Sequence, residues 1–273
     1  MPSGVLIVAT DLDGTLWDRD ARLPAEHRSA IHRLTVAGVP LLAATARGPR
    51  SAVDAIAGNG MDDVPVACLN GALGLEPDGS RFVDSPFSRE DAETVLNTFE
   101  QHALQPCLAV FDPLSEQIVS AAPSTCSEHL RYLGRRARIE DLRGVAEAQP
   151  VYAMSIAGRK RALLAGVGGA LGAAGTCRVM LTPDPVYAGW TLRVGPRGVD
   201  KWSATRAYCL AHGISPSAVM AVGDSLDDVP LLRSSAVAVA GPGRHPEAVA
   251  QSAHLIEPVG RRGWAQVPVL AGT

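Results

Sequence analysis

Short, unbroken runs of hydrophobic residues alternate with helical patterns over the first third of the chain. Residues 5–9, 39–44 and 64–69 are almost entirely apolar, which is typical of strands buried on both faces. Between these runs, residues 24–38 and about 49–57 have helical spacing, and each stretch begins with a proline. This order of strand, helix, strand, helix and strand predicts a parallel, doubly wound sheet.

The pattern changes after a predicted hairpin that closes the first part of the chain. Its strands are residues 73–75 and 81–83, joined by the turn residues Pro77, Asp78 and Gly79. In the next stretch, pairs of strand patterns alternate with helix patterns, which favours an α+β domain with an antiparallel sheet. Its strands are predicted at residues 107–111, 117–121, 151–156, 177–181 and 191–194, and its helices at 88–103, 127–138 and 159–173.

The first pattern returns after Pro196, which indicates that the two ends of the chain build one domain. Helical patterns at residues 201–212, 229–232 and 246–252 alternate with strand patterns at 219–222 and 236–240. We therefore expect an α/β core of residues 1–84 and 195–273, into which an α+β domain of residues 85–194 is inserted.

Length and composition support two folded domains and argue against several kinds of partner. A chain of 273 residues is long enough for two domains, and its 47% hydrophobic and 19% charged residues argue against disorder. The formal net charge of -3 gives no reason to expect a nucleic-acid partner or a membrane surface.

Neither the cysteines nor the apolar segments indicate an exported or membrane protein. The five cysteines are scattered without a C-x-x-C spacing, so we expect thiols in a reducing compartment rather than disulfides or zinc ligands. The N-terminus lacks the basic region of a signal peptide, and the longest apolar stretch, residues 162–175, is shorter than the roughly 20 residues of a membrane span. We expect a cytoplasmic protein that is a monomer or a small homo-oligomer.

Polar residues stand at the carboxyl ends of four predicted strands, the edge where open α/β sheets bind ligands. An isolated buried charge is costly, so clustered carboxylates with few cations nearby call for a divalent metal. Oxygen ligands of this kind favour Mg²⁺. Lys201, at the start of the helix before the last of these strands, is placed to face the same edge. The strand-end residues are Asp11, Asp13, Thr45, Asn70, Asp224, Asp227 and Asp228.

Four motifs in order make the chain similar to a known family. They are DLDGTL from Asp11, TAR from Thr45, RGVDK ending at Lys201, and GDSLDD around Asp224, while NGA from Asn70 precedes the insertion. In these features the sequence resembles phosphatases of the haloacid dehalogenase (HAD) superfamily, and it is most similar to the Cof-type subgroup with a class IIB cap. The resemblance implies a HAD-like doubly wound parallel core with an inserted α+β cap domain.

The resemblance also implies Mg²⁺-dependent hydrolysis of a small phosphomonoester, with a sugar phosphate as the first expectation. Asp11 would attack phosphorus and form an aspartyl phosphate, and Lys201 would relieve the negative charge. Asp13 would protonate the leaving alkoxide and then take a proton from the hydrolytic water. Mg²⁺ would be held by Asp11, the backbone carbonyl of Asp13 and Asp224, with Asp228 close by or acting through water.

A second group of residues is implied to bind the substrate. The Thr45 hydroxyl and the backbone amides of Leu12 and Ala46 would hold phosphoryl oxygens, together with Lys201. Arg47 and Asn70 are further candidates for contact with the phosphate or the substrate. A surface role for Arg47 and a turn role for Asn70 remain open at this stage.

The motif residues also have ordinary structural interpretations. Asp11 and Asp13 could be turn residues, and Asp224 could cap a helix. Taken alone, Thr45 is well explained as the end of a strand and Lys201 as a solvated helix residue. Four motifs at compatible spacing, each after the appropriate predicted element, favour the catalytic interpretation.

Asp227 departs from the family pattern, in which this position is usually asparagine. A carboxylate there would repel the substrate phosphate unless it binds the metal or is protonated, so Asp227 is an additional candidate ligand. We expect Asp227→Asn to keep or raise phosphatase activity. A metal-dependent loss above tenfold, about 1.4 kcal/mol, would instead identify Asp227 as a ligand.

Other functions and features carry less weight. A phosphomutase or a nucleotide phosphatase would use the same intermediate, whereas a Mg²⁺-dependent phospho-ligand binder would not need Asp13. The glycine-rich residues 166–172 lie in a predicted helix and lack the G-x-G-x-x-G spacing of a dinucleotide loop. A group of arginines in the insertion is best explained as a solvated helix face; its members are Arg131, Arg135, Arg136 and Arg138.

Overall fold

The structure, a computed structural model, comprises two compact units. The described residues are 4–18, 20–112, 115–122, 137–184, 189–241 and 245–273. Unit 1 comprises Met1–Asp84 and Asp200–Thr273, and unit 2 comprises Ser85–Val199. The predicted insertion ends at residue 194, whereas unit 2 ends at Val199.

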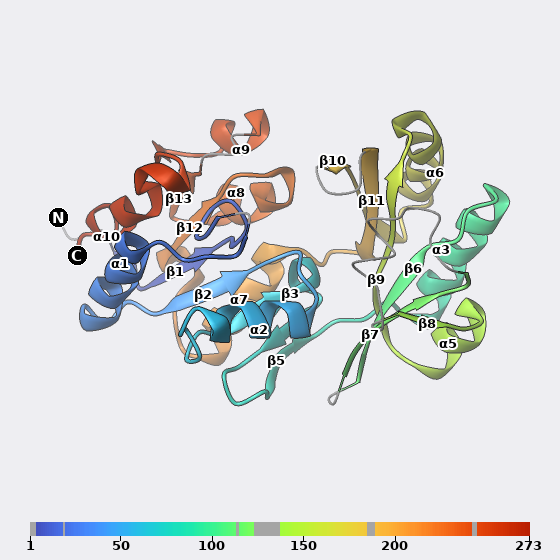
Figure 1. The fold of residues 1–273 in the computed structure, drawn as a ribbon, viewed down its shortest axis with the longest axis horizontal. Helices are drawn as coiled ribbons and strands as arrows, with labels where there is room; N and C mark the ends of the chain where they lie inside the picture. The colour runs from blue at the N-terminus through green and yellow to red at the C-terminus, as the bar shows by residue number, and fades with distance from the viewer. Residues whose placement is uncertain (1–3, 19, 113–114, 123–136, 185–188, 242–244) are drawn as a thin grey trace. The chain divides into compact units, whose positions relative to one another are not determined.

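Unit 1 is built on an eight-stranded sheet in the order β14-β13-β12-β1-β2-β3-β4-β5 (Figure 1). The pairs from β14 to β3 are parallel, and β3, β4 and β5 form an antiparallel meander that ends the first segment of the unit. Its strands are β1 Ile7–Thr10, β2 Leu41–Ala44, β3 Val66–Cys68, β4 Leu73–Leu75, β5 Arg81–Asp84, β12 Val219–Gly223, β13 Val237–Ala240 and β14 His254–Leu255.

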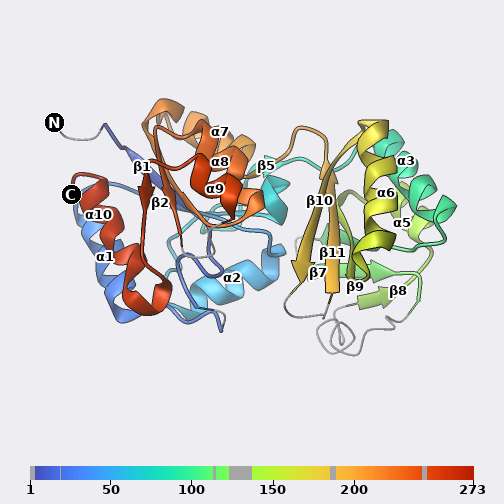
Figure 2. The same cartoon turned by 90° about the horizontal axis from the view of Figure 1, so that it is seen from above.

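Helices cover both faces of this sheet, as its unbroken apolar strands require. Every residue of β1 and β2 is buried. Ile7 and Ala9 pack with residues of α7, α8 and α9 on one face, and Figure 2 shows α1 and α2 on the other side of the sheet. The helices are α1 Ala25–Val36, α2 Pro49–Gly58, α7 Lys201–Ala211, α8 Val229–Ser234, α9 Pro246–Ala250 and α10 Val267–Leu270. The predicted doubly wound parallel core is confirmed.

The strand order reverses at β1, and this places the candidate site. From β1 the chain moves outward through β2 and β3, whereas β12 returns on the opposite side of β1. The carboxyl ends of β1 and β12 therefore lie side by side at a topological switch point, where open α/β sheets bind ligands. The amide of Asp11 donates to the Val222 carbonyl at 2.8 Å, which fixes the ends of the two strands together.

Unit 2 is an α+β layer with a six-stranded sheet in the order β10-β11-β9-β6-β7-β8. Its strand pairs are antiparallel except for β7 with β8, and one face packs against the apolar sides of three helices. The strands are β6 Cys107–Asp112, β7 Ser115–Ser120, β8 Ala137–Ile139, β9 Val151–Arg159, β10 Cys177–Asp184 and β11 Gly189–Pro196, and the helices are α3 Arg89–Gln101, α5 Leu142–Ala148 and α6 Arg161–Ala174.

The predicted helix at residues 127–138 is wrong at its end. Residues 127–136 lie outside the described part of the chain, together with Arg131, Arg135 and Arg136 of the arginine group. Ala137 and Arg138 belong to β8, where they pair with Ile118 and Val119 of β7. Pairing at the edge of the sheet overrides the local helical preference.

The structure contains a helix that the hydrophobic pattern does not predict. α5 has only two buried residues, Leu142 and Val145, so it is too short to show a helical period. Its start is nevertheless marked by Asp141, whose carboxylate accepts a hydrogen bond from the Gly144 amide at 2.8 Å. The helix start predicted at Ser88 is confirmed, and there the side chain caps α3 in the same way.

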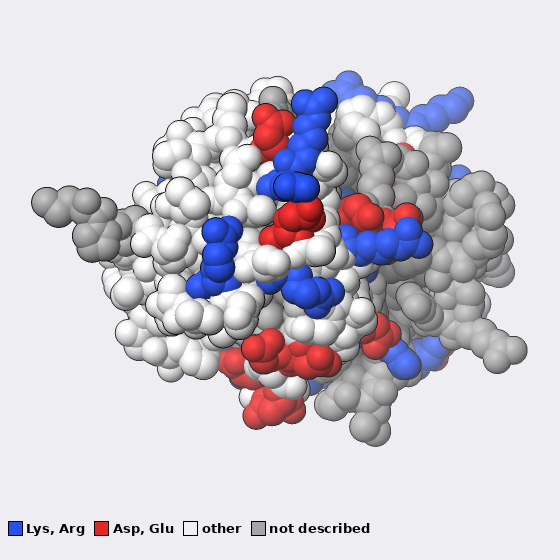
Figure 3. Space-filling model, turned by 60° about the vertical axis from the view of Figure 1, so that its left-hand side comes forward, with Lys and Arg blue, Asp and Glu red and all other residues white. Residues whose placement is uncertain are grey.

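Two further features of the described residues are the charge on their surface and the apolar character of their helices. On the face drawn in Figure 3, several acidic side chains gather at the lower edge, and basic and acidic side chains are interspersed over the rest of the residues shown. Among the described residues, no helix has both the length and the apolar character that crossing a bilayer requires.

Candidate functional site

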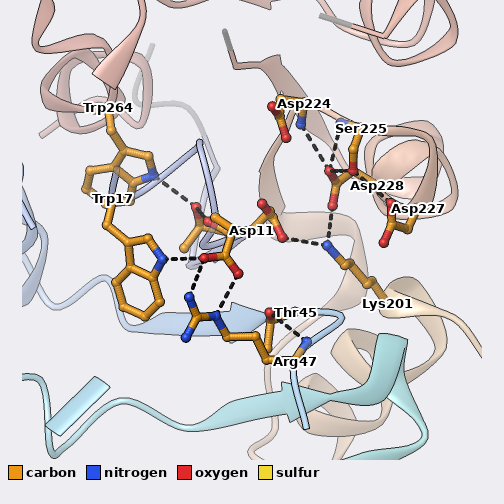
Figure 4. A network of polar contacts seen from close by, with 12 residues as sticks. Asp11, Trp17, Thr45, Arg47, Lys201, Asp224, Ser225, Asp227, Asp228 and Trp264 are labelled. Carbon is orange, nitrogen blue, oxygen red and sulfur yellow. Dashed lines mark hydrogen bonds and ion pairs between the residues drawn. The ribbon is translucent and has the colours of Figure 1, made fainter. Parts of the chain in front are cut away.

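A buried lysine bridges two aspartates at the switch point of unit 1. The ammonium group of Lys201 lies 2.6 Å from Oδ1 of Asp11 and 2.6 Å from Oδ1 of Asp228 (Figure 4). Lys201 is only 1% exposed, so these interactions take place almost without water. Burial alone would lower the pKa of Lys201, but the two carboxylates outweigh it and raise this pKa, which keeps the ammonium charged.

The start of α7 holds Lys201 in place. Asp200 caps the helix by accepting from the Ser203 amide at 2.8 Å, and the Ser203 hydroxyl completes a capping box. Gly71 packs directly against this cap, because a Cβ on Gly71 would collide with the carbonyl oxygen of Asp200. Position 71 favours glycine for a second reason, because its φ of +96° is unfavourable for residues with a Cβ.

The loop after β12 fixes the second carboxylate. Oδ2 of Asp228 accepts from the amides of Asp224 and Ser225, each at 3.0 Å, and from the Ser225 hydroxyl at 2.6 Å. Gly223 leaves room for this arrangement, because a Cβ there would collide with Asp228. The same Ser225 hydroxyl lies 2.9 Å from Oδ1 of Asp227, which is 8% exposed.

Three of these aspartates form a group that fits a metal ion. Asp11, Asp224 and Asp228 each offer one carboxylate oxygen, and these oxygens all lie within 4.8 Å of one another. Burial raises the pKa of Asp11 well above its usual value and the pKa of Asp224 to about 6, and the neighbouring carboxylates act in the same direction. One ammonium group does not balance this charge, whereas a hard divalent cation bound by oxygen ligands would.

Asp13 lies at the same edge but has different partners. Arg47 binds it with two hydrogen bonds, from Nε to Oδ2 at 2.7 Å and from Nη2 to Oδ1 at 2.6 Å, and the Trp17 indole nitrogen donates to Oδ1 at 3.0 Å. Burial alone would raise the pKa of Asp13, but these donors outweigh it and lower the pKa. The sequence left the role of Arg47 open, and in the structure its guanidinium group binds the Asp13 carboxylate.

The candidate phosphate-binding residues follow β1, β2 and β3. The Thr45 hydroxyl accepts from the Arg47 amide at 3.1 Å, and the Thr45 carbonyl accepts from the Asn70 amide at 2.9 Å. Asn70 has a φ of +55°, and its Oδ1 is buried with no hydrogen-bond partner among the described residues. Leu12 and Ala46 lie between motif residues at the ends of β1 and β2, so their backbones belong to the same edge.

Sequence reasoning missed three side chains that organise the site. Ser225 binds Asp228, Trp17 binds Asp13, and the Trp264 indole donates to the Thr10 hydroxyl at 2.9 Å. Thr10 in turn donates to the backbone carbonyl of Asp11 at 2.8 Å. Trp17 could have been noticed, because it directly follows the first motif and stands four residues after Asp13. No periodicity in the sequence connects Trp264 with β1.

The doubly wound core, with an aspartate–lysine cluster at its switch point, defines an α/β protein whose site suits a divalent cation and an anion. The chain matches the family model of haloacid dehalogenase-like hydrolases over residues 8–131 and 186–266, and it belongs to that family. The resemblance drawn from the four motifs is therefore confirmed. A search of the curated proteins found no match to the chain.

Solved structures of the same superfamily share the fold at low sequence identity. BT1666 of Bacteroides thetaiotaomicron, described among phosphatases of the superfamily, is 17% identical with a TM-score of 0.80, covering 98% of this chain and 95% of its own. TM0651 of Thermotoga maritima is 16% identical with a TM-score of 0.78, covering 97% of each chain. The subclass IIB sugar phosphatase BT4131 is 17% identical with a TM-score of 0.76, covering 97% of this chain and 98% of its own.

Proposed function

We propose that this protein is a Mg²⁺-dependent phosphatase that hydrolyses a small phosphomonoester through an aspartyl phosphate. The observation that carries the proposal is the buried bridge from Lys201 to Asp11 and Asp228, with Asp224 beside it. A second acid, Asp13, is held separately at the same edge of the sheet. Phosphoryl transfer needs both a carboxylate nucleophile and an acid–base group, and membership of this hydrolase family supports that use.

The proposed reaction has two steps that use the two acids differently. Lys201 binds Oδ1 of Asp11, and we assign the attack on phosphorus to Oδ2. As the bond from phosphorus to the ester oxygen breaks, that oxygen takes a proton from Asp13. Asp13 must enter this step protonated, although Arg47 and Trp17 lower its pKa and favour the ionised form. In the second step Asp13 removes a proton from water, the water oxygen attacks phosphorus, and the bond from phosphorus to Asp11 breaks to release phosphate.

Residues of both segments of unit 1 would hold the metal and the phosphate. Mg²⁺ would be held by Asp11, Asp224 and the backbone carbonyl of Asp13, and when bound it would neutralise charge on the transferring phosphoryl group. Asp228 already accepts from Lys201 and from three donors in its own loop, so we assign it to the support of Lys201 and of the metal site. Asp227 stays an additional candidate ligand.

Phosphoryl oxygens would be bound by donors at the ends of β1, β2 and β3. We assign this role to the hydroxyl of Thr45, the amides of Leu12 and Ala46, and the ammonium of Lys201. Asn70 is a further candidate, because a 180° turn of its amide presents the nitrogen in place of the unpartnered oxygen. Arg47 is assigned to Asp13 rather than to the phosphate.

The proposed substrate class is a sugar phosphate or a similar phosphometabolite. A structurally similar protein is described as a sugar phosphatase, and this supports the class without identifying the compound. We assign substrate selection to unit 2, which comes from the inserted residues. Neither a nucleic acid nor a membrane is a proposed partner.

The test is phosphate release from a panel of sugar phosphates, nucleotides and other phosphomonoesters in the presence of Mg²⁺. We expect release from at least one compound, its loss in EDTA, and its loss in Asp11→Asn. The matched control is Asp62→Asn, an exposed acid of the same unit, which should retain activity. Unchanged release by Asp11→Asn would contradict the proposal. Transfer of phosphate to a second hydroxyl of the substrate, without release, would identify a phosphomutase instead.

A further inference from the structure

One tryptophan contacts the side chains of both Asp13 and the arginine that binds it. The Trp17 indole nitrogen donates to Oδ1 of Asp13 at 3.0 Å. The guanidinium carbon of Arg47 lies 5.5 Å from the centroid of the Trp17 ring, within the range of a cation–π interaction. Trp17 therefore contacts this carboxylate through its indole nitrogen and the arginine that binds the carboxylate through the face of its ring.

Trp17 is more deeply buried than the two side chains that it contacts. It is fully buried, whereas 44% of the Asp13 side chain and 24% of the Arg47 side chain are exposed. Its backbone also closes the loop that carries Asp13, because Gly14 donates to the Trp17 carbonyl at 3.0 Å and Trp17 donates to Leu12 at 3.1 Å. A buried ring with a buried backbone has little freedom to move, so it can hold an exposed carboxylate in one orientation.

We infer that Trp17 is a positioning residue, which fixes the carboxyl group of Asp13 for proton transfer to the leaving group. The inference rests on the proposed phosphatase function and adds to it a residue outside the four motifs. In the step concerned, the O–H bond of Asp13 breaks and an O–H bond forms on the departing oxygen while the bond from phosphorus to that oxygen breaks. Misorientation of Asp13 should slow this first step, which kcat/KM reports, only where the leaving oxygen needs that proton. The second step, in which Asp13 takes a proton from water, is common to all substrates.

Two synthetic esters of similar shape separate this role from a general structural one. The phenolate of 4-nitrophenyl phosphate leaves without protonation, whereas the far more basic alkoxide of 4-nitrobenzyl phosphate requires a proton. We expect Trp17→Phe, which keeps an aromatic ring but loses the N–H group, to lower kcat/KM for the benzyl ester roughly tenfold. For the phenyl ester kcat/KM should change less than about twofold.

Trp264→Phe is a matched control. Trp264 is also fully buried, and its indole nitrogen donates at 2.9 Å to Thr10 rather than to Asp13. Loss of that bond should leave the ratio of the two rates unchanged, whatever it does to each rate. If Trp17→Phe lowers kcat/KM equally for both esters, as Trp264→Phe would, Trp17 has only a structural role and the inference is overturned.

A double-mutant cycle with Asp13→Asn gives a second readout. If Trp17 acts through Asp13, then Trp17→Phe should slow the benzyl ester no further once Asp13 has been replaced, whereas independent effects would multiply. Should Trp17→Phe fail to fold, Trp17→Tyr is used in the same cycle. Wild-type protein that releases phosphate neither from these esters nor from any compound of the phosphomonoester panel would contradict the proposed function itself. Wild-type hydrolysis with no selective loss in the variants would overturn only the role of Trp17.

Discussion

At the scale of single residues, the site depends on one ammonium group. The chain has two lysines, and Lys201 is the one buried between Asp11 and Asp228. The other, Lys160, is exposed at the start of α6 in unit 2. A buried charge without its partner is far more costly than a surface charge, so the two lysines should respond very differently to the same substitution.

We expect Lys201→Met to destabilise the metal-free protein by about 3–5 kcal/mol, because it leaves two buried carboxylates unpaired. Phosphatase activity should fall about 10²–10³-fold, the usual effect of removing one group that stabilises transition-state charge. Urea unfolding and steady-state kinetics measure the two effects. Lys160→Met should change neither, and a Lys201→Met protein as stable as the wild type would contradict the importance of the bridge.

Asp227 is a second residue whose effect can be measured. It is buried, and the Ser225 hydroxyl lies 2.9 Å from its Oδ1. An amide oxygen accepts the same hydrogen bond, so Asp227→Asn should fold normally while losing the charge that repels a phosphate. We expect the activity of this variant to equal or exceed that of the wild type at saturating Mg²⁺. A loss above tenfold that added Mg²⁺ relieves would show that Asp227 binds the metal.

Burial of His27 makes part of the free energy of unfolding depend on pH. It is fully buried in α1, its Nδ1 lies 2.7 Å from the Leu16 carbonyl, and its Nε2 has no partner among the described residues. Burial lowers the pKa of His27, although the Leu16 carbonyl and the nearby Glu26 oppose this. The folded protein therefore favours the neutral ring, so this stability is present above the unfolded pKa of about 6.5 and is lost as pH falls below it.

As pH falls from 7.5 to 5, we expect His27 to lower the free energy of unfolding, whereas Asp224, whose pKa is raised to about 6, acts in the opposite direction. The contribution of His27 is therefore the difference between the slopes of wild type and His27→Gln. Urea unfolding across this range measures the slope. The exposed His32→Gln, in the same helix, should keep the wild-type slope. Identical slopes in wild type and His27→Gln would show that His27 does not contribute.

At the scale of elements, a strained turn sets the position of a helix. Leu69, Asn70 and Gly71 all have positive φ, and this turn packs against the start of α7, where Lys201 lies. Left-handed backbone is unfavourable for residues with a Cβ, so its persistence at Leu69 and Asn70 indicates that the surrounding structure holds it. The turn therefore links the end of β3 to the charge at the centre of the site.

Gly71→Ala tests that link. The new Cβ would meet the Asp200 carbonyl, so α7 must shift and carry Lys201 with it. We expect a loss of about 2–3 kcal/mol in stability and a clear loss of kcat. Gly213→Ala is the control, because Gly213 has a φ of +67° but no neighbouring atom within 4 Å. That variant should lose about 1 kcal/mol and keep its kcat. Equal effects of the two substitutions would show that the contact with α7 is unimportant.

Elements and motifs were predictable from the sequence where the signal is local. The unbroken apolar runs of β1 and β2 specify buried parallel strands, and the polar residues that follow them specify the functional edge. Strand β8 and helix α5 were not predictable, because each is stabilised by neighbours rather than by its own periodicity. The contact of Arg47 with Asp13 joins two loops that are 34 residues apart, and sequence spacing alone does not specify such a contact.

At the scale of the whole molecule, unit 1 is assembled from two separate segments of the chain. Strands β1 to β5 come from the first segment and β12 to β14 from the second. Both segments also supply carboxylates to the site: Asp11 comes from the first segment, and Asp224 and Asp228 come from the second. A cation bound by this group would tie the two segments together by oxygen ligands from each.

Mg²⁺ should therefore stabilise unit 1 selectively. At a concentration about 100 times the dissociation constant, a ligand that binds only the folded state adds about 2.7 kcal/mol. Hydrogen exchange should slow in β1 and β12, which carry the ligands, and stay unchanged in β9 and β11 of unit 2. Asp224→Asn should weaken this protection, whereas the exposed Asp62→Asn should retain it. Equal protection of both units, or none in β1 and β12, would contradict a metal site built from the two segments.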